Sequence, residues 1–199
     1  RLRKEAPDLL LLGGDYVTSE VYLNELFHSL SAINPKDGIY AVLGNHERRY
    51  KDAALQAMHD FDVNLLADTV VEIERIPGVI YLAGVYDSFL YDSLVVQPAE
   101  LVDNDAFVML LCHTPDYAER SSTTADLVFS GHTHGGQVSL FGLYTPVKNT
   151  RYGRRFLRGM NRTTNGTAVI TTNGVGTSRR RVRFCVPSEI VVVTLKCAE

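Results

Sequence analysis

Two histidines stand one residue apart in the segment "GHTHGGQV", residues 131–138, with a glycine before the first and a glycine pair after the second. Imidazole is a common metal ligand and a general acid or base near neutral pH. In extended backbone, residues two positions apart point to the same side, so this spacing predicts that His132 and His134 face one crevice. The glycines would let the backbone turn sharply and come close to a bound ion or anion.

Other polar residues follow apolar runs elsewhere in the chain, namely "DLLLLGGD", "GIYAVLGNHE", "AFVMLLCHTPD" and "ADLVFSGHTHGG". Short runs of Val, Leu and Ile bounded by turn residues are typical of strands buried on both faces. If the four runs are neighbouring strands of one α/β layer, the residues after them lie at its carboxyl edge, where such sheets bind ligands. We therefore expect six side chains to converge there: Asp15, Asn45, His46, His113, His132 and His134.

The donor atoms of this group indicate a particular kind of metal. A carboxylate, an amide oxygen and three imidazoles suit manganese, iron or zinc better than calcium or magnesium alone. Structural zinc sites are typically rich in thiolates, so the lack of cysteine in the group argues against one. The sequence therefore predicts a divalent transition-metal site among these convergent side chains.

The bulk composition bounds the class of protein. A chain of 199 residues with 45% hydrophobic and 22% charged residues is long enough for one sizeable core, so we predict a single domain over residues 1–199. The three cysteines are too few for a disulfide framework and are interpreted as reduced thiols. No run reaches the ~20 apolar residues of a membrane span, and we expect the chain as it stands to be soluble.

The charge is distributed unevenly along the chain. None of the 23 acidic residues lies between Leu127 and Ser188. That stretch holds Lys148, Arg151, Arg154, Arg155, Arg158, Arg162, Arg179, Arg180, Arg181 and Arg183. Two interpretations stay open: an anionic partner such as a phosphate substrate or lipid headgroup, or a solvated basic face. Nucleic acid ranks last because no aromatic residues interleave the arginines.

Further elements follow from periodicity. Apolar residues at helical spacing predict a helix in "SEVYLNELFHSLSAI" after a cap at Ser19, and a second helix over Lys51–Asp60. The runs "TVVEIERI" and "VIYLAGVYD" predict a hairpin around Pro77 and Gly78. The β-branched runs "TAVITTNGVG" and "EIVVVTL" predict further antiparallel sheet.

The order of "GGDY", "GNHE", "CH" and "GHTH" resembles the calcineurin-like metallophosphoesterases, whose pattern runs Asp-x-His, Gly-Asp, Gly-Asn-His-Asp/Glu, His, Gly-His-x-His. The longer "GHTHGGQV", with "GVGTS" and "RVRFCVPSEIVVVTL" downstream, is similar to the bacterial phosphodiesterase branch of that family. The resemblance covers nearly the whole chain. It implies an α/β fold, the αββα sandwich of mixed sheets that these enzymes share.

The same resemblance implies a role for each matched residue. Asp15 would bridge two divalent ions, Asn45, His113 and His132 would complete the second ion's ligands, and His134 would bind the first. His46 would be the acid or transition-state stabiliser, with Glu47 behind the ligands. Such paired ions generate a hydroxide for in-line attack on phosphorus. The implied substrate is an anionic phosphoester, such as a small or lipid-linked phosphodiester, whose binding residues the motifs do not identify.

One motif of the pattern is missing from this sequence. The fourteen residues before Asp15 contain no histidine, and Asp8 begins the strand that leads to Asp15, so Asp-x-His has no counterpart. We expect an N-terminally shortened piece that lacks its first strand, or otherwise a natural remnant, in which the first ion keeps only Asp15 and His134. One bound ion per chain is then expected instead of two.

A function from another class stays open beside the hydrolase. The same fold also serves as a protein-interaction scaffold without activity, and the missing motif favours that alternative, whereas intact "GNHE" and "GHTH" disfavour it. Relatives in the similar branch often carry an upstream signal or membrane anchor. A membrane surface therefore stays among the partners considered, while location and oligomeric state are left open.

Overall fold

The computed structural model describes residues 1–75, 78–86, 98–103, 105–121, 123–178 and 180–196. Its first half contains, in chain order, α1 (Leu2–Glu5), β1 (Leu10–Leu12), η1 (Glu20–Tyr22), α2 (Leu23–Ser31), β2 (Ile39–Ala41), η2 (Glu47–Arg49), α3 (Lys51–Asp60), β3 (Val63–Leu65), β4 (Thr69–Arg75) and β5 (Gly78–Gly84). Its second half contains η4 (Pro98–Leu101), β6 (Phe107–Leu111), α4 (Asp116–Arg120), β7 (Leu127–Ser130), η5 (His134–Gly136), β8 (Gly159–Arg162) and β9 (Ala168–Thr171).

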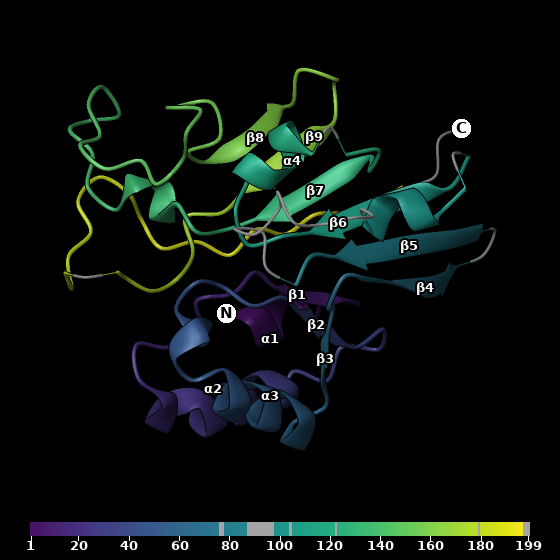
Figure 1. Cartoon of the computed structure of the whole chain (residues 1–199). Helices are drawn as coiled ribbons and strands as arrows, with labels where there is room; N and C mark the ends of the chain where they lie inside the picture. Colours follow the sequence, from purple (N-terminus) through teal and green to yellow (C-terminus); the bar gives the residue numbers. More distant parts are fainter. Residues whose placement is uncertain (76–77, 87–97, 104, 122, 179, 197–199) are drawn as a thin grey trace.

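Two sheets lie face to face in the middle of the molecule (Figure 1). The smaller sheet has the order β1-β2-β3 and is parallel throughout. The larger sheet has the order β4-β5-β6-β7-β9-β8, with parallel pairs in its centre and an antiparallel pair at each edge. Helices α2 and α3 cover the outer face of the smaller sheet, and α4 lies on the outer face of the larger one. The predicted αββα sandwich is therefore confirmed.

Alternation along the strands explains why four layers form. In β6, Val108 and Leu110 pack toward α4 and Phe156, whereas Met109 and Leu111 pack between the two sheets. Consecutive residues of a strand point to opposite faces, so a run that is apolar at every position buries both faces at once. The runs of Leu and Val seen in the sequence are thus the inner strands of a sandwich whose two sheets are each covered on both sides.

The four motif-bearing runs do not lie in one layer. The runs before Asp15 and Asn45 form β1 and β2 of the smaller sheet, while those before His113 and His132 form β6 and β7 of the larger sheet. The expectation of neighbouring strands in a single sheet is wrong. A continuous apolar run shows that a strand is buried on both faces, but it does not identify which strand lies beside it.

The local elements predicted from periodicity are mostly present. The second helix spans Lys51–Asp60 as predicted, and the first helical segment consists of η1 followed by α2. The predicted hairpin is confirmed as the antiparallel pair β4 and β5, although Pro77 of its turn lies outside the described residues. Ser19 precedes the first helical segment but makes no side-chain cap hydrogen bond.

The end of the chain differs from the prediction. The run "TAVITTNGVG" forms β9, which pairs with β8, but the run "EIVVVTL" (residues 189–195) forms no strand. Within the part of the chain that the structure describes, this segment has no ladder partner, and Val191, Val192 and Leu195 are exposed. β-branched composition favours a strand only where a neighbouring strand offers hydrogen bonds and a packing face. Over the described ranges, every helix is too short or too polar to span a bilayer.

Candidate metal centre

The loops that carry the predicted ligands meet at one edge of the sandwich, where β1, β2, β6 and β7 all end. The link between the two sheets is direct: the His113 Nδ1 atom, from the larger sheet, lies 2.6 Å from the carbonyl oxygen of Gly13, from the smaller sheet. The convergence predicted for a single sheet is therefore achieved by two sheets whose carboxyl ends share one edge.

Four donor atoms surround one point in this edge. The Nε2 atom of His113 lies 3.3 Å from Asp15 Oδ2, 3.3 Å from Asn45 Oδ1 and 3.1 Å from His132 Nδ1. Metal–ligand bonds of about 2.1 Å place neighbouring ligand atoms roughly 3.0 to 3.4 Å apart in tetrahedral or octahedral geometry. Asp15, His113 and His132 thus form a group that could hold a divalent transition-metal ion, and Asn45 Oδ1 lies at a similar distance from His113.

The hydrogen bonds fix which nitrogen of His113 is available. A carbonyl oxygen only accepts, so Nδ1 of His113 must carry a proton and donate it to Gly13. In the neutral ring the lone pair is then on Nε2, the atom that faces Asp15, Asn45 and His132. A backbone acceptor behind a histidine in this way orients the ring toward a metal and raises its basicity.

The charges of the cluster push the pKa values of its members apart. Burial opposes ionisation of Asp15, but the hydrogen bond and charge of His113 outweigh burial and lower the pKa of Asp15. Burial also opposes a charged His113, yet the hydrogen bond and charge of Asp15 raise the pKa of His113 overall. Burial, followed by repulsion from His113, lowers the pKa of His132 to about 3. His132 is therefore neutral at physiological pH, the form in which it can bind a metal.

His134 and His46 flank this cluster instead of joining it. His134 belongs to η5, and burial followed by the charge of Arg183 lowers its pKa. Its Nδ1 atom is buried without a hydrogen-bond partner in the described structure, as expected of a side chain that awaits a ligand. The backbone N–H of His46 donates to Asp15 Oδ1 at 2.9 Å, which places His46 beside the cluster. The roles of all six residues remain predictions.

The reason given for the spacing of His132 and His134 is wrong. The backbone is not extended there, because His132 and His134 both have left-handed φ angles, of 64° and 52°. Between them Thr133 is fully buried, donates to the Leu157 carbonyl at 2.7 Å and accepts from the Gly135 N–H at 3.2 Å. Thr133 is thus an anchor between the two histidines that the sequence reasoning missed.

A third candidate ligand, Asp15, also has a left-handed φ, of 58°. This conformation costs a residue with a Cβ roughly 1 kcal/mol or more and is otherwise left to glycine. Three of the five predicted ligands therefore hold an unfavourable backbone conformation. Strain of this kind gathers at sites where the position of a side chain matters more than the stability of its backbone.

Glu47 holds the two loops of the smaller sheet together. Its carboxylate is fully buried and accepts N–H bonds from Asp15 at 2.7 Å, Tyr16 at 2.9 Å and Gly44 at 2.7 Å. The Tyr50 hydroxyl donates a further bond at 3.2 Å. Both oxygens are thus directed at backbone donors behind the cluster, so Glu47 positions the ligand loops and does not itself face the metal.

Close approach of the same two loops explains the glycines of the motifs. A Cβ atom added at Gly14, whose φ is 89°, would lie 2.5 Å from the Gly44 nitrogen and 2.7 Å from Nδ1 of His113. A Cβ atom does not come this close to other heavy atoms, so a side chain here would force the loops apart. The second glycine of "GGDY" is therefore required by packing within the site.

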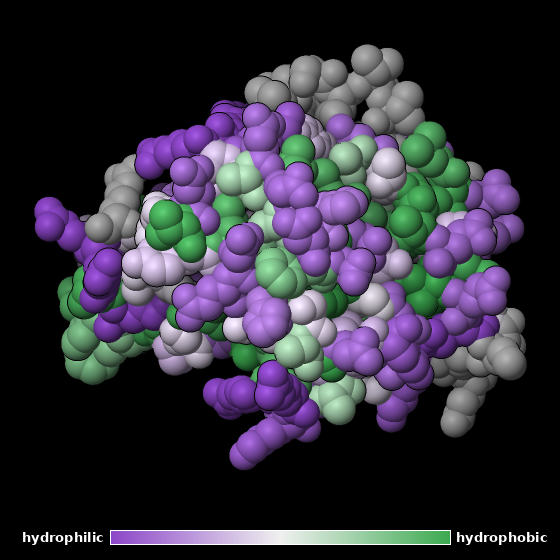
Figure 2. All heavy atoms as spheres, turned by 90° about the horizontal axis from the view of Figure 1, so that it is seen from below, coloured by the Kyte–Doolittle hydropathy of each residue, from purple (hydrophilic) through white to green (hydrophobic). Residues whose placement is uncertain are grey.

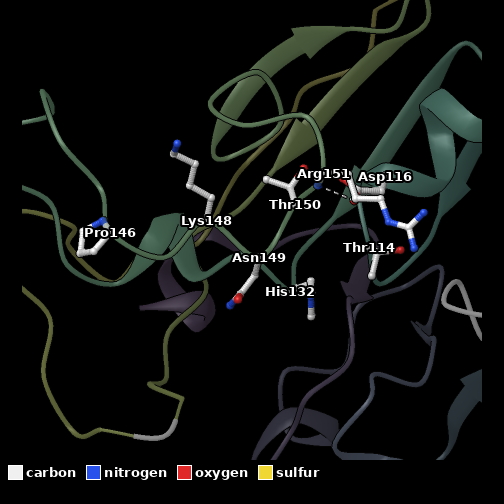
Figure 3. Close-up of a pocket in the computed structure, with 8 residues that line it drawn as sticks. All are labelled: Thr114, Asp116, His132, Pro146, Lys148, Asn149, Thr150 and Arg151. Atoms are coloured by element: carbon white, nitrogen blue, oxygen red, sulfur yellow. Dashed lines mark hydrogen bonds between the residues drawn. The ribbon is translucent and has the colours of Figure 1, made fainter.

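A cavity of about 480 Å³ opens beside the cluster (Figure 3). Thr114, Asp116 and His132 line it together with Pro146 and Lys148–Arg151 of segment 146–151. Asp116 fixes this segment, because its carboxylate accepts bonds from the Thr150 hydroxyl at 2.5 Å and the Arg151 N–H at 2.8 Å. Lys148 and Arg151 bring positive charge to the cavity, in which the Lys148 side chain points away from Asn149 (Figure 3). The motifs gave no signal for this lining.

Several arginines of the basic third are bound to backbone carbonyl groups. Arg154 donates to Gly142 and Leu143, Arg155 to Arg162, and Arg162 to Gly166. Arg183 donates to Asn173, Gly174 and Gly176, and thereby closes the "NGVGTS" loop as a turn. These four arginines therefore have structural roles. The sequence analysis considered only an anionic partner or a solvated basic face for this charge.

Residues that the sequence placed outside the site lie outside it. His28 and His59 are exposed on α2 and α3. Cys112 is buried in the core, and burial raises its pKa to about 12, so it is a thiol at neutral pH. Tyr16 packs edge-on against Phe27. Cys112 and Cys185 are free cysteines, and Cys197 is not among the described residues.

Comparison with known proteins gives a consistent result. The sequence model of the calcineurin-like phosphoesterase family matches residues 1–136. The chain is 34% identical to an uncharacterized metallophosphoesterase of Aquifex aeolicus, over 97% of this chain and 74% of that protein. It is 29% identical to one of Helicobacter pylori, over 94% and 51%, and 28% identical to YkuE of Bacillus subtilis, over 98% and 70%. The chain thus spans about half the length of the Helicobacter relative.

The Glu47 clamp makes a testable prediction. In Glu47→Gln, one acceptor oxygen becomes an NH₂ group that faces an N–H donor, which leaves buried donors unsatisfied at about 1 to 3 kcal/mol each. We expect the free energy of unfolding in urea to fall by about 2 kcal/mol or more, and the affinity for Mn²⁺ in titration calorimetry to fall at least tenfold. Glu25→Gln, at an exposed position of α2, is the matched control. Wild-type affinity and stability in Glu47→Gln would contradict the positioning role.

Proposed function

Because the chain belongs to the calcineurin-like phosphoesterase family, a family of metal-dependent phosphoester hydrolases, we propose that it hydrolyses phosphodiesters at the edge where β1, β2, β6 and β7 end. The observation that carries the proposal is the set of three donor atoms around His113 Nε2, each at the distance expected between ligands of one ion. Asp15, Asn45, His113 and His132 would hold that ion, and His134 a second one with Asp15.

The reaction divides between the ions and the side chains. Bound ions would supply a hydroxide nucleophile for in-line attack on phosphorus and neutralise the charge on the phosphoryl oxygens. His46 would give a proton to the departing oxygen, a step typically worth about 10² to 10⁴ in rate. Its backbone N–H already bonds the carboxylate of Asp15, which sets the loop beside the reacting group.

The cavity beside His132 suggests where the rest of the substrate lies. His132 belongs to both the metal cluster and the cavity lining, and Lys148 and Arg151 line the same cavity. A phosphodiester with a second anionic group could place its phosphorus at the metal and that group between the two cations. The proposed substrate class is therefore an anionic phosphodiester that carries an additional charged group.

Removing a ligand tests the proposal directly. With added Mn²⁺ the protein should release p-nitrophenolate from bis(p-nitrophenyl) phosphate, and Asn45→Ala and His132→Ala should each lower kcat/KM at least 10³-fold, because an ion is lost or misplaced. His28→Ala, which removes an exposed imidazole from α2, should keep full activity.

Two outcomes would count against this function. Mn²⁺-dependent turnover that survives both Asn45→Ala and His132→Ala would place the chemistry elsewhere. Metal bound to the wild-type chain without hydrolysis of any phosphoester would favour a protein-interaction scaffold with impaired catalysis.

The role of His46 has its own signature. A poor leaving group needs a proton in the transition state, whereas p-nitrophenolate leaves without one. His46→Ala should therefore lower kcat for a phenyl or alkyl diester at least tenfold more than for the p-nitrophenyl diester, at unchanged metal content. Equal losses on both substrates would assign His46 to charge stabilisation and not to proton donation.

Lys148 should affect only substrates that reach it. We expect Lys148→Met to raise KM about threefold to tenfold for a p-nitrophenyl diester with a carboxylate on its other arm, and to leave the uncharged counterpart unchanged. Lys36→Met, at an exposed lysine paired with Asp8, controls for the loss of surface charge. An equal change in KM for both substrates would remove Lys148 from the substrate site.

A further inference from the structure

A loop of exposed apolar residues follows η5 in the chain. Phe141 and Leu143 expose 82% and 81% of their surface, and Leu140 and Tyr144 are exposed as well. The loops around it lie at the left end of the molecule in Figure 1, and Figure 2 shows apolar spheres next to strongly hydrophilic ones at that end. Single exposed apolar residues are ordinary, but a contiguous group marks a surface that binds something.

Hydrogen bonds hold this loop, residues 140–144, in its outward shape. The Leu140 N–H donates to the Tyr144 carbonyl at 2.8 Å, and the Leu143 N–H donates to the Leu140 carbonyl at 2.9 Å. Arg154 donates to the carbonyls of Gly142 and Leu143 at 2.5 and 2.9 Å. Backbone hydrogen bonds and Arg154 thus hold the turn in one conformation, in which its apolar side chains are exposed to solvent.

A second segment, residues 180–184, lies against the loop and adds charge to it. The Ser139 N–H donates to the Phe184 carbonyl at 2.9 Å, and the Gln137 side chain donates to the Arg180 carbonyl at 2.9 Å. The rings of Phe141 and Phe184 meet edge to face, with centroids 6.5 Å apart. Residues 140–144 and Phe184 thus form an apolar tip, and the exposed Arg180 and Arg181 belong to the same segment as Phe184.

No negative charge from the same part of the chain offsets these arginines. The sequence from Leu127 to Ser188 has ten basic residues and no Asp or Glu. Apolar side chains at the tip with Arg and Lys around them are the chemistry that binds the interface of an anionic bilayer: the apolar groups enter the acyl boundary and the cations meet the lipid headgroups.

We propose that the apolar tip, with Arg180 and Arg181, docks the protein on anionic lipid bilayers. Along the chain, the loop lies between η5, which carries His134, and segment 146–151, which lines the cavity. This binding needs neither metal nor catalysis, and it goes beyond the proposed hydrolysis.

Vesicle sedimentation in EDTA tests the docking independently of activity. Large unilamellar vesicles of phosphatidylglycerol and phosphatidylcholine in equal amounts should carry the wild-type chain down, and pure phosphatidylcholine vesicles should carry down at least tenfold less. Binding should weaken as NaCl is raised, because exposed charges are screened.

The paired variants separate the two parts of the surface. Phe141→Ser with Leu143→Ser should lower the partition coefficient at least tenfold, since each exposed apolar side chain moved out of water is worth about tenfold or more. Arg180→Gln with Arg181→Gln should weaken binding only to the anionic vesicles. Val21→Ser with Tyr22→Ser, which removes two exposed apolar residues from η1, is the matched control and should bind as the wild type does.

Circular dichroism and thermal unfolding establish that each variant folds. Equal sedimentation with and without phosphatidylglycerol, or wild-type binding by the folded Phe141→Ser, Leu143→Ser variant, would overturn the proposal. Concentration-dependent dimers in light scattering that the same variant abolishes, without vesicle binding, would also overturn it and assign the tip to a second copy of the chain. A failed hydrolysis assay leaves these outcomes unaffected.

Discussion

The buried carboxylate of Glu47 is the constraint on which the metal centre depends. Three backbone N–H groups from two loops point at it, so the loops after β1 and β2 can only take up positions that satisfy the same pair of oxygens. A buried charge that is fully hydrogen-bonded is stable, whereas a partly satisfied one is costly. The carboxylate thereby fixes Asp15 and Asn45 relative to each other before any ion arrives.

The larger sheet is joined to these loops by His113. One nitrogen of its ring bonds the backbone beyond β1, and the other faces the donor atoms of Asp15, Asn45 and His132. A single buried ring thus serves as a bond between the sheets and as the centre of the donor cluster. The mutual effect of Asp15 and His113 on their pKa values arises from this arrangement, in which opposite charges favour each other where burial alone would neutralise both.

Much of this could be predicted from the sequence, and the rest could not for definable reasons. Apolar runs and motif order predicted the strands, the layered α/β fold and the residues that now surround His113 Nε2. No single apolar run shows which of the two sheets its strand belongs to, because a strand buried on both faces has the same apolar pattern in either sheet. The anchor Thr133 and the cavity wall around Lys148 depend on contacts between distant segments, such as Asp116 with Thr150, which no local pattern encodes. The strand predicted for residues 189–195 does not form because its β-branched residues favour a strand but, in the described structure, have no neighbouring strand to pair with.

The left-handed backbone at Asp15, His132 and His134 has a consequence for attempts to make the protein more robust. Glycine would relax the chain at each of these three positions, so a screen that rewards heat resistance alone will tend to recover such replacements. Each of them deletes a donor atom. Selection for thermal stability should therefore favour glycine at these positions, whereas selection for turnover should favour the ligand residues. Only a screen that scores both properties will retain the three ligands.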